Sequence, residues 1–305
     1  MGEFMNTQEV ARYLGIHEKK VYHLVKAGKI PCTRVTGKWI FPKSLVDQWI
    51  AESAGGPVRL RREDERPFLL AAGSDDPSLT ILRELYSRRL SSLPLFLATV
   101  GSSAGLAAIR DGVADVALAH LLDPETGEYN LPYIREVHPS GVTAVPLFYR
   151  ELGLVLRPGN PFGLRQVADL ARTGLRIVNR QKGSGTRQYL DHELARLGID
   201  SKLINGYDNH VVTHLEVGLK ILRAEADAGI VTRAAARLLG LDFTPLTRER
   251  FDILISKERF FSRGVQVLLE IVGSREFRTR VEGLGGYDTS ESGRILAPDL
   301  RKETP

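Results

Sequence analysis

Three segments of this 305-residue chain combine glycines with short hydroxyl side chains: AAGSD at 71–75, TVGSSAG at 99–105 and NRQKGSGTR at 179–187. Each follows an apolar run and precedes a stretch with helical spacing. The free backbone N–H groups of helix N-termini, with serine or threonine hydroxyls, can hold an anion almost without positive side chains. A single such loop is better explained by helix capping and turn formation. The anion-site hypothesis therefore depends on the three loops meeting.

The candidate anion-binding residues come from these loops, from one further helix start and from the end of a strand. His120 ends an apolar run, and a hydrogen-bonded structural histidine is the alternative for both His120 and His214. Arg187 would hold either the anion or the second lobe of the fold. The full set is Ser74, Ser102, Ser103, His120, Ser184, Gly185, Thr186, Arg187, Thr213 and His214.

Other site chemistries find less support in the sequence. No loop fits the nucleotide-binding patterns G-x-x-x-x-G-K-[ST] or G-x-G-x-x-G. The single cysteine, Cys32, excludes an internal disulfide and a multi-cysteine zinc site. Catalysis would need an acid, base or nucleophile in the cleft, and Asp75, Asp76, His120 and His214 have no recognisable partner spacing. We therefore predict no enzymatic activity, no catalytic cofactor and no metal-cation ligands.

The segments that must position these loops alternate between strand and helix patterns from residue 68 onward. Strand-like runs cover 68–72, 95–100, 113–120, 142–148, 152–156, 176–179, 228–231 and 251–256, with helical spacing at 77–90, at 104–110 and from 186. Such alternation predicts parallel sheets covered by helices, with ligands at the carboxyl ends of the strands. About 235 residues are long for one such sheet, so two lobes are expected.

Charge is concentrated in the N-terminal fifth of the chain. Residues 1–62 contain eleven Lys/Arg and five Asp/Glu, whereas the other 243 residues contain 31 and 32. A basic module attached to a nearly neutral body suggests that the module binds nucleic acid. A solvated basic surface is the alternative if charge is the only evidence.

The basic module has the pattern of three short helices and a hairpin. Asn6 and Glu9 have capping-box spacing before a first helix that ends at Gly15. A second helix is predicted over 17–27, followed by two β-favouring runs around a turn at 36–37. A third helix over 43–51 is predicted to direct its apolar residues into the core, namely Leu45, Val46, Trp49 and Ile50.

This module resembles the MerR/excisionase type of winged helix-turn-helix over residues 5–51. The resemblance rests on NTQEVARYLGIHEKKVYHLVKAGKIP, on R-V-x-G-K-W and on D-x-W-I. It implies that the second helix enters a DNA major groove. His17 departs from the family, which commonly has a small capping residue there. The implied DNA contacts are His17, Lys19, Lys20 and Tyr22 from the helix, with Arg34 and Lys38 from the wing.

The body resembles the cytoplasmic relatives of periplasmic molybdate-binding proteins over residues 68–286. The strings that carry this are VGSSAGLAAI, ADVALAHLLDPETGEYNLPYI, IVNRQKGSGTRQYLD, THLEV and GLDFTPLTRERFDILI. The resemblance implies an α/β, two-lobed type II periplasmic-binding-protein-like domain after a small, mainly α winged helix-turn-helix domain. It also implies a tetrahedral oxyanion as effector, with molybdate or tungstate as the first candidates.

These patterns predict the domain limits. Residues 1–4 are expected to be a cloning remnant, 5–51 the DNA-binding domain and 52–67 a linker, with an exposed helix over 58–66 as the alternative for part of it. Residues 68–305 form the sensing domain, with lobe I at 68–148 and 256–305 and lobe II at 149–255. No secretory signal and no apolar run of about 18 residues is seen, so a cytoplasmic protein without a membrane partner is expected.

The two resemblances together predict a one-component transcription regulator. Oxyanion binding would change lobe closure, and lobe closure would change binding to double-stranded operator DNA, with a homodimer or higher oligomer matching the half-sites. A sensor of another small anion or ligand on the same fold is the first alternative. An enzyme of molybdenum-cofactor metabolism and a recombination-directionality or architectural protein are others.

Overall fold

The computed structural model describes residues 4–35, 38–53, 66–137 and 141–296. The chain divides into two compact units, Met1–Arg66 and Pro67–Pro305. Among the described residues, no helix has both the length and the apolar character needed to cross a membrane. The predicted turn at 36–37 and most of the predicted linker lie outside the described residues.

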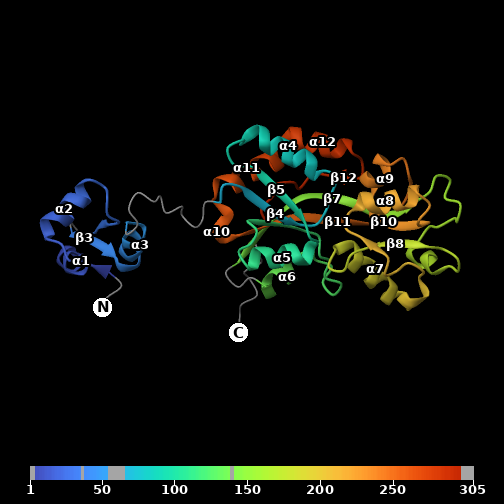
Figure 1. The fold of residues 1–305 in the computed structure, drawn as a ribbon, viewed down its shortest axis with the longest axis horizontal. Helices are drawn as coiled ribbons and strands as arrows, with labels where there is room; N and C mark the ends of the chain where they lie inside the picture. The colour runs from blue at the N-terminus through green and yellow to red at the C-terminus, as the bar shows by residue number, and fades with distance from the viewer. Residues whose placement is uncertain (1–3, 36–37, 54–65, 138–140, 297–305) are drawn as a thin grey trace. The chain divides into compact units, whose positions relative to one another are not determined.

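The first unit is a small three-stranded sheet packed with three helices (Figure 1). The strands pair antiparallel in the order β1-β3-β2. The predicted capping box is confirmed, because the Asn6 side chain accepts from the backbone of Glu9 while the Glu9 carboxylate accepts from the backbone of Asn6. The elements are β1 (Phe4–Met5), α1 (Thr7–Leu14), α2 (Glu18–Lys26), β2 (Thr33–Val35), β3 (Lys38–Pro42) and α3 (Lys43–Ser53).

One prediction for this unit is wrong, and one strand was not predicted. Leu45 was predicted to face the core, but its side chain is 47% exposed, because Val46, Trp49 and Ile50 take the inward face of α3. Strand β1 was not predicted. Phe4, which the sequence assigned to a remnant, pairs there with the end of β3.

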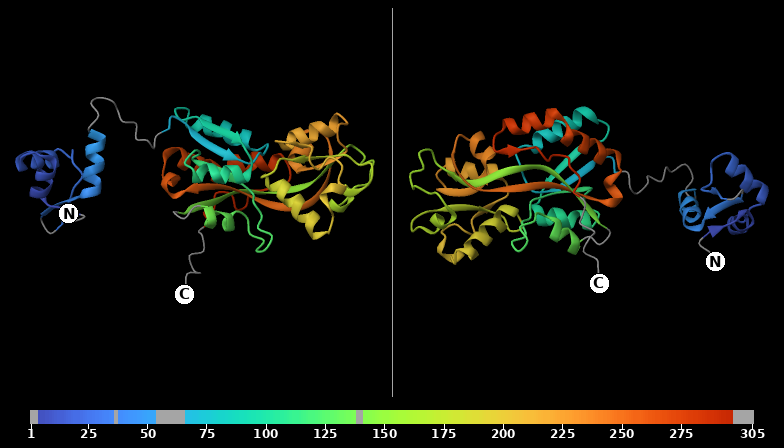
Figure 2. Two further views of the ribbon diagram at one scale, coloured as in Figure 1. Left: turned by 60° about the horizontal axis from the view of Figure 1, so that its bottom comes forward. Right: turned by 180° about the vertical axis from the view of Figure 1, so that it is seen from behind.

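The second unit contains one long mixed sheet with helices on both faces (Figures 1 and 2). The strand order is β5-β4-β6-β11-β7-β10-β8-β9, and β12 pairs with β7. The elements are β4 (Leu69–Gly73), α4 (Leu79–Arg89), β5 (Leu95–Thr99), α5 (Ser102–Arg110), β6 (Val116–Ala119), α6 (Leu131–Val137), β7 (Val142–Leu156), β8 (Ile177–Arg180), α7 (Gly185–Arg196), β9 (His210–Val211), α8 (His214–Leu222), β10 (Ala228–Thr232), α9 (Arg233–Leu238), β11 (Asp242–Ser256), α10 (Lys257–Phe260), α11 (Arg263–Gly273), α12 (Arg275–Gly283) and β12 (Tyr287–Asp288), with short 3-10 helices at Val167–Ala171 and Ser201–Leu203.

Strands β7 and β11 connect two lobes and make the sheet mixed rather than wholly parallel. Each is 15 residues long, and they pair antiparallel with each other along most of their length. At one end β11 pairs with β6, and at the other β7 pairs with β10. The runs predicted separately at 142–148 and 152–156 are therefore one strand. Its polar middle stays extended because Arg150 is buried while Tyr149 and Glu151 are half-buried.

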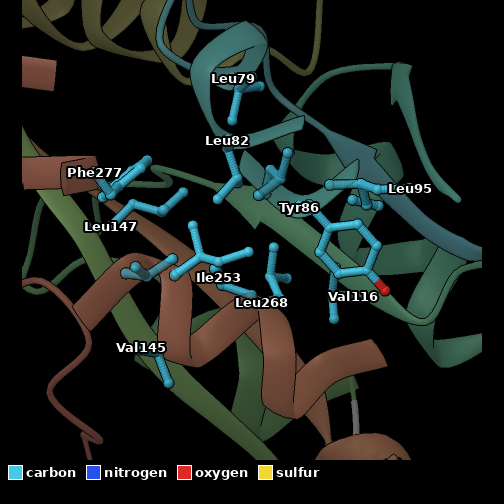
Figure 3. Packing of buried hydrophobic residues seen from close by; sticks show 14 of the residues in the cluster. Leu79, Leu82, Tyr86, Leu95, Val116, Val145, Leu147, Ile253, Leu268 and Phe277 are labelled. Atoms are coloured by element: carbon cyan, nitrogen blue, oxygen red, sulfur yellow. The ribbon is translucent and has the colours of Figure 1, made fainter. Parts of the chain in front are cut away.

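Each lobe has its own hydrophobic core. In lobe I, α4, α11 and α12 cover one face of the sheet and α5 and α6 the other (Figures 1 and 2). Figure 3 shows Leu82, Tyr86, Ile253, Leu268 and Phe277 packed together in this core. Burying one such large side chain contributes about 1.5–3 kcal/mol. The cluster includes β11 residues from Phe251 onward, which the sequence had placed in lobe II.

The core of lobe II surrounds the other halves of the two long strands. On one face, β7 and β10 pack against the segment leading to β8 and against α7. On the other face, Val155 and Val178 pack with α8 and α9. Both lobes are therefore built on the same two strands, β7 and β11.

Candidate anion-binding site

Strands β4, β5 and β6 are parallel, so the loops that follow them lie at one edge of the sheet. Ser74 follows β4, Ser102 begins α5, and His120 follows β6. The Ser74 hydroxyl lies 2.8 Å from Nε2 of His120, and the His120 backbone N–H donates to Oγ of Ser102 over 3.3 Å. All three side chains are buried. Lobe I therefore contributes two of the three predicted loops to one place.

The third predicted loop approaches from lobe II. The backbone N–H of Ser103 donates to the carbonyl of Gly183 over 3.2 Å. A Cβ placed on Gly185 would lie 2.6 Å from the backbone oxygen of His120 and 2.4 Å from its Nδ1. Only glycine allows such an approach without displacement. Ser184 caps α7, since its Oγ accepts from the backbone of Arg187.

A buried ionic network, which the sequence did not predict, lies behind these loops. Arg150 in the middle of β7 donates through Nε to Glu249 over 2.7 Å and through Nη1 to Asp76 over 2.6 Å. The other Glu249 oxygen lies 2.9 Å from Nδ1 of His120. Asp76 also accepts from the hydroxyl of Tyr287 over 2.8 Å. The sequence does contain a pattern that could have predicted this network. Charged residues interrupt two otherwise apolar strands, as YRE in β7 and as RER in β11.

The charges of this network determine where its protons lie. Burial opposes ionisation of Glu249, but His120 and Arg150 outweigh it and lower its pKa to about 2. Burial lowers the pKa of His120, although Glu249 counteracts it, so the imidazole is neutral. An ionised carboxylate only accepts, so His120 Nδ1 carries the proton and Nε2 accepts from the Ser74 hydroxyl.

This proton arrangement corrects two candidate ligands. Ser74 was predicted to donate to the anion, but its hydroxyl proton is used by His120. His120 itself has both ring nitrogens engaged, by Ser74 and by Glu249. Both residues therefore position the loops, and the structural alternative for His120 is the one that the geometry favours.

Several buried donors near the same junction have no hydrogen-bond partner among the described residues. Arg180 ends β8 and is 1% exposed; its Nη2 donates to the carbonyl of Val212. Burial lowers the pKa of Arg180 to about 10, although Asp75 counteracts it. A buried polar group without a partner costs about 1–3 kcal/mol, so a ligand rich in acceptors would be stabilised here. The unpartnered atoms are Arg150 Nη2, Arg180 Nη1, Gln181 Nε2, Thr186 Oγ1 and both ring nitrogens of His214.

His214 links these donors electrostatically. Burial is the main reason that its pKa lies well below the usual value, and the charges of Arg180 and Arg150 lower it further. The imidazole is therefore neutral, with one donor and one acceptor nitrogen. Sequence reasoning missed Arg150 and Arg180 because it looked for an anion site nearly free of positive side chains.

Two candidates point to other partners. Arg187 donates to Asp191 over 2.9 Å, and its guanidinium lies 3.9 Å from the ring centre of Tyr207. Thr213 caps α8 by exchanging hydrogen bonds with Glu216. These contacts of Arg187 and Thr213 lie within lobe II, and the Thr213 hydroxyl is engaged by Glu216. Of the two roles predicted for Arg187, the structure favours the one in the lobe.

The candidate DNA-binding residues lie mainly on α2. His17, Lys19, Lys20 and Tyr22 are exposed, and His17, Lys19 and Lys20 line one surface hollow with His23. His17 acts as the helix cap, because its Nδ1 accepts from the backbone of Lys19 over 3.3 Å. The family's small capping residue is thus replaced by an imidazole. Lys38 is exposed at the start of β3, whereas the side chain of Arg34 lies outside the described residues.

Comparisons with known proteins agree with this architecture. Residues 4–54 match a helix-turn-helix domain, and residues 83–273 match the PBP superfamily domain. Neither domain type is a catalytic family. The uncharacterized protein YvgK of Bacillus subtilis (strain 168) is 31% identical over 302 residues, which are 95% of this chain and 96% of that protein.

Two further matches cover parts of the chain. An uncharacterized protein of Clostridium pasteurianum, named for the 5' region of a ferredoxin 2Fe-2S gene, is 38% identical over 108 residues, 35% of this chain and 96% of that one. A putative phosphate ABC transporter substrate-binding protein with bound phosphate, from Clostridium perfringens, has a TM-score of 0.53 at 14% identity, covering 71% of this chain and 97% of that chain. The chain therefore belongs to the PBP superfamily and carries a helix-turn-helix domain before the PBP-like domain.

Proposed function

We propose that this protein is a DNA-binding regulator whose PBP-like domain senses a small tetrahedral oxyanion, with molybdate and tungstate as the first candidates. The observation that carries the proposal is the set of buried, unpartnered donors on Arg150, Arg180, Thr186 and His214. The hydroxyl protons of Ser102 and Ser184 add to them, because both oxygens accept from backbone N–H groups. An oxyanion supplies the acceptors and the charge that such donors require.

Binding at this place would be coupled to closure of the lobes. The donors come from both lobes, so an anion that contacts them all favours the arrangement in which the lobes meet. The DNA-binding residues would be His17, Lys19, Lys20 and Tyr22 on α2, with Arg34 and Lys38 on the wing. A homodimer or higher oligomer would place two such modules on successive half-sites. The oxyanion would then act on DNA through its different affinity for the two lobe arrangements.

The first prediction is that molybdate or tungstate stabilises the PBP-like domain of the full chain. At a hundred times its Kd, the anion adds about 2.7 kcal/mol to the free energy of unfolding, which raises Tm by roughly 5–10 °C. Scanning calorimetry with molybdate, tungstate, phosphate and sulfate measures this. Both tryptophans lie in the first unit, so their fluorescence serves as an internal control. No shift with any of these anions would exclude the oxyanion site, and an equal shift with sulfate would remove molybdate and tungstate as preferred ligands.

The second prediction concerns Lys19. Lys19→Ala is expected to weaken binding to a 30-base-pair random-sequence duplex and to reduce the slope of log K against log salt by about 1, because one phosphate contact is lost. Fluorescence anisotropy over a salt series measures both quantities. Lys202→Ala removes an exposed lysine from the PBP-like domain and is the matched control. An unchanged salt slope for Lys19→Ala would remove Lys19 from the DNA contacts.

A further inference from the structure

The charged side chains at the junction, which are buried except for the half-buried Asp75, do not favour a fully ionised oxyanion. The set contains two positive guanidinium groups and three carboxylates. The guanidinium groups are those of Arg150 and Arg180, and the carboxylates are those of Asp75, Asp76 and Glu249. The histidines add no charge, since burial holds the pKa of His120 and His214 below the usual value. This set carries one net negative charge before any ligand enters. A dianion would bring it to three.

Asp75 accepts fewer hydrogen bonds than the other two carboxylates. Glu249 is held by His120 and Arg150, and Asp76 by Arg150, Tyr287 and Ser78. The Asp75 carboxylate has a single hydrogen bond among the described residues, from the backbone N–H of His214 to its Oδ2 over 3.1 Å. His214 is the first residue of α8, which packs in the core of lobe II, whereas Asp75 follows β4 in lobe I.

Asp75 thus lies where the proposed function puts the oxyanion. Its carboxylate caps a helix of nine residues and lies beside the buried Arg180. The side chain of His214 at the same helix start is buried and has no partner for either ring nitrogen. An incoming anion would meet the negative charge of the half-buried Asp75 carboxylate at short range.

Resting on the proposed function, we propose that Asp75 is a specificity-determining residue, and that the oxyanion binds together with one proton held between a ligand oxygen and the Asp75 carboxylate. With molybdate or tungstate, which hold no proton at neutral pH, the proton comes from solvent. With a hydrogen-phosphate-type anion, the ligand brings it. No covalent bond forms or breaks in this step.

The surroundings of Asp75 are consistent with proton uptake at this residue. Burial raises the pKa of its carboxyl group, while Arg180, the His214 N–H and Arg150 oppose the rise and Asp76 adds to it. These groups belong to β8, α8, β7 and the loop of Asp75 itself. A proton on the Asp75 carboxylate therefore costs less than on a carboxylate exposed to water.

Titration calorimetry of the full chain with molybdate tests the proposal. Measurements from pH 6 to 8, in buffers of different ionisation enthalpy, are expected to show about one proton taken up per molybdate. The association constant is expected to fall about tenfold per pH unit as pH rises. Asp75→Asn is expected to abolish both the proton uptake and the pH slope and to bind molybdate more tightly than the natural chain at pH 8. Asp111→Asn, which removes an exposed carboxylate from the C-terminal end of α5, is expected to keep both.

The outcomes separate this proposal from the proposed function. Binding of molybdate by Asp75→Asn but not by the natural chain at pH 8 supports the proton requirement. Molybdate binding without proton uptake by the natural chain, a measurement independent of any variant, overturns it and leaves the oxyanion sensor in place. Absence of binding by both proteins with molybdate, tungstate and phosphate overturns the sensor and this inference together.

Discussion

Replacing Arg150 by methionine is expected to lower the free energy of unfolding of the PBP-like domain by about 3–5 kcal/mol at neutral pH. The side chain is fully buried between Glu249 and Asp76, to which it donates through Nε and Nη1. Methionine fills the space but leaves two buried carboxylates without their cation, and this is the costly way to break a buried ion pair. Urea denaturation followed by far-UV circular dichroism measures the loss.

The size of this loss is expected to depend on pH. In the natural chain the pKa of Glu249 is lowered to about 2, so its contribution is complete above the unfolded value of about 4.5 and is lost as pH falls from there toward 2. In Arg150→Met, burial dominates and raises the Glu249 pKa, so folding takes up a proton. The free energy of unfolding of the variant therefore rises as pH falls from 7.5 to 5. Over the same range, Glu249 does not change the stability of the natural chain.

A matched control separates charge from surface effects. Arg89→Met removes a guanidinium whose ion pair with Glu270 is exposed, and it is expected to cost no more than about 1 kcal/mol. Tryptophan fluorescence should report unchanged unfolding of the first unit in both variants. A loss of less than 1 kcal/mol for Arg150→Met, with no recovery at pH 5, would contradict the ionic network.

Gly185→Ala is expected to separate the lobes without unfolding them. The added methyl group would lie 2.6 Å from the backbone oxygen of His120, an atom that cannot move alone. Overpacking of this kind costs about 1–3 kcal/mol, or roughly fivefold to a hundredfold in oxyanion affinity. Faster hydrogen exchange is expected at the backbone amide of Ser103, which donates to the carbonyl of Gly183 in the other lobe.

Gly273→Ala serves as the control for this variant. Gly273 ends α11, and a Cβ there would meet no atom within 4 Å. Its exchange rates at the junction and its oxyanion affinity are expected to match those of the natural chain. Unchanged amide exchange at Ser103 in Gly185→Ala would show that the close approach of Gly185 to His120 does not hold the lobes together.

Much of the local structure was predictable because it depends on residues a few positions apart. The capping box of Asn6 and Glu9, the buried face of α4 and the start of α7 near Thr186 all follow from spacing within one or two helical turns. Two outcomes were not predicted. The inward face of α3 excludes Leu45, and Phe4 pairs in β1, because packing rather than apolar character decides each.

The candidate site divides in the same way. Its three loops were recognisable because glycines and hydroxyls at helix starts have a local chemical meaning, and the structure brings these loops together. The direction of each proton was not recognisable. Whether Ser74 donates to an anion or to His120 depends on Glu249, which lies 129 positions from His120 in the chain.

The sequence alone determined the three helices of the first unit, the helices that became α4, α5 and α7, most strands, the basic N-terminal module and the loops available for an anion, since each is set by neighbours along the chain. The tertiary structure decided that β7 and β11 run through both lobes, that Arg150 is buried against a carboxylate 99 positions away, and that Asp75 caps α8 from the other lobe. Charges so distant in sequence acquire their energies only when folding removes water from between them, because Coulomb interactions strengthen as the local dielectric falls.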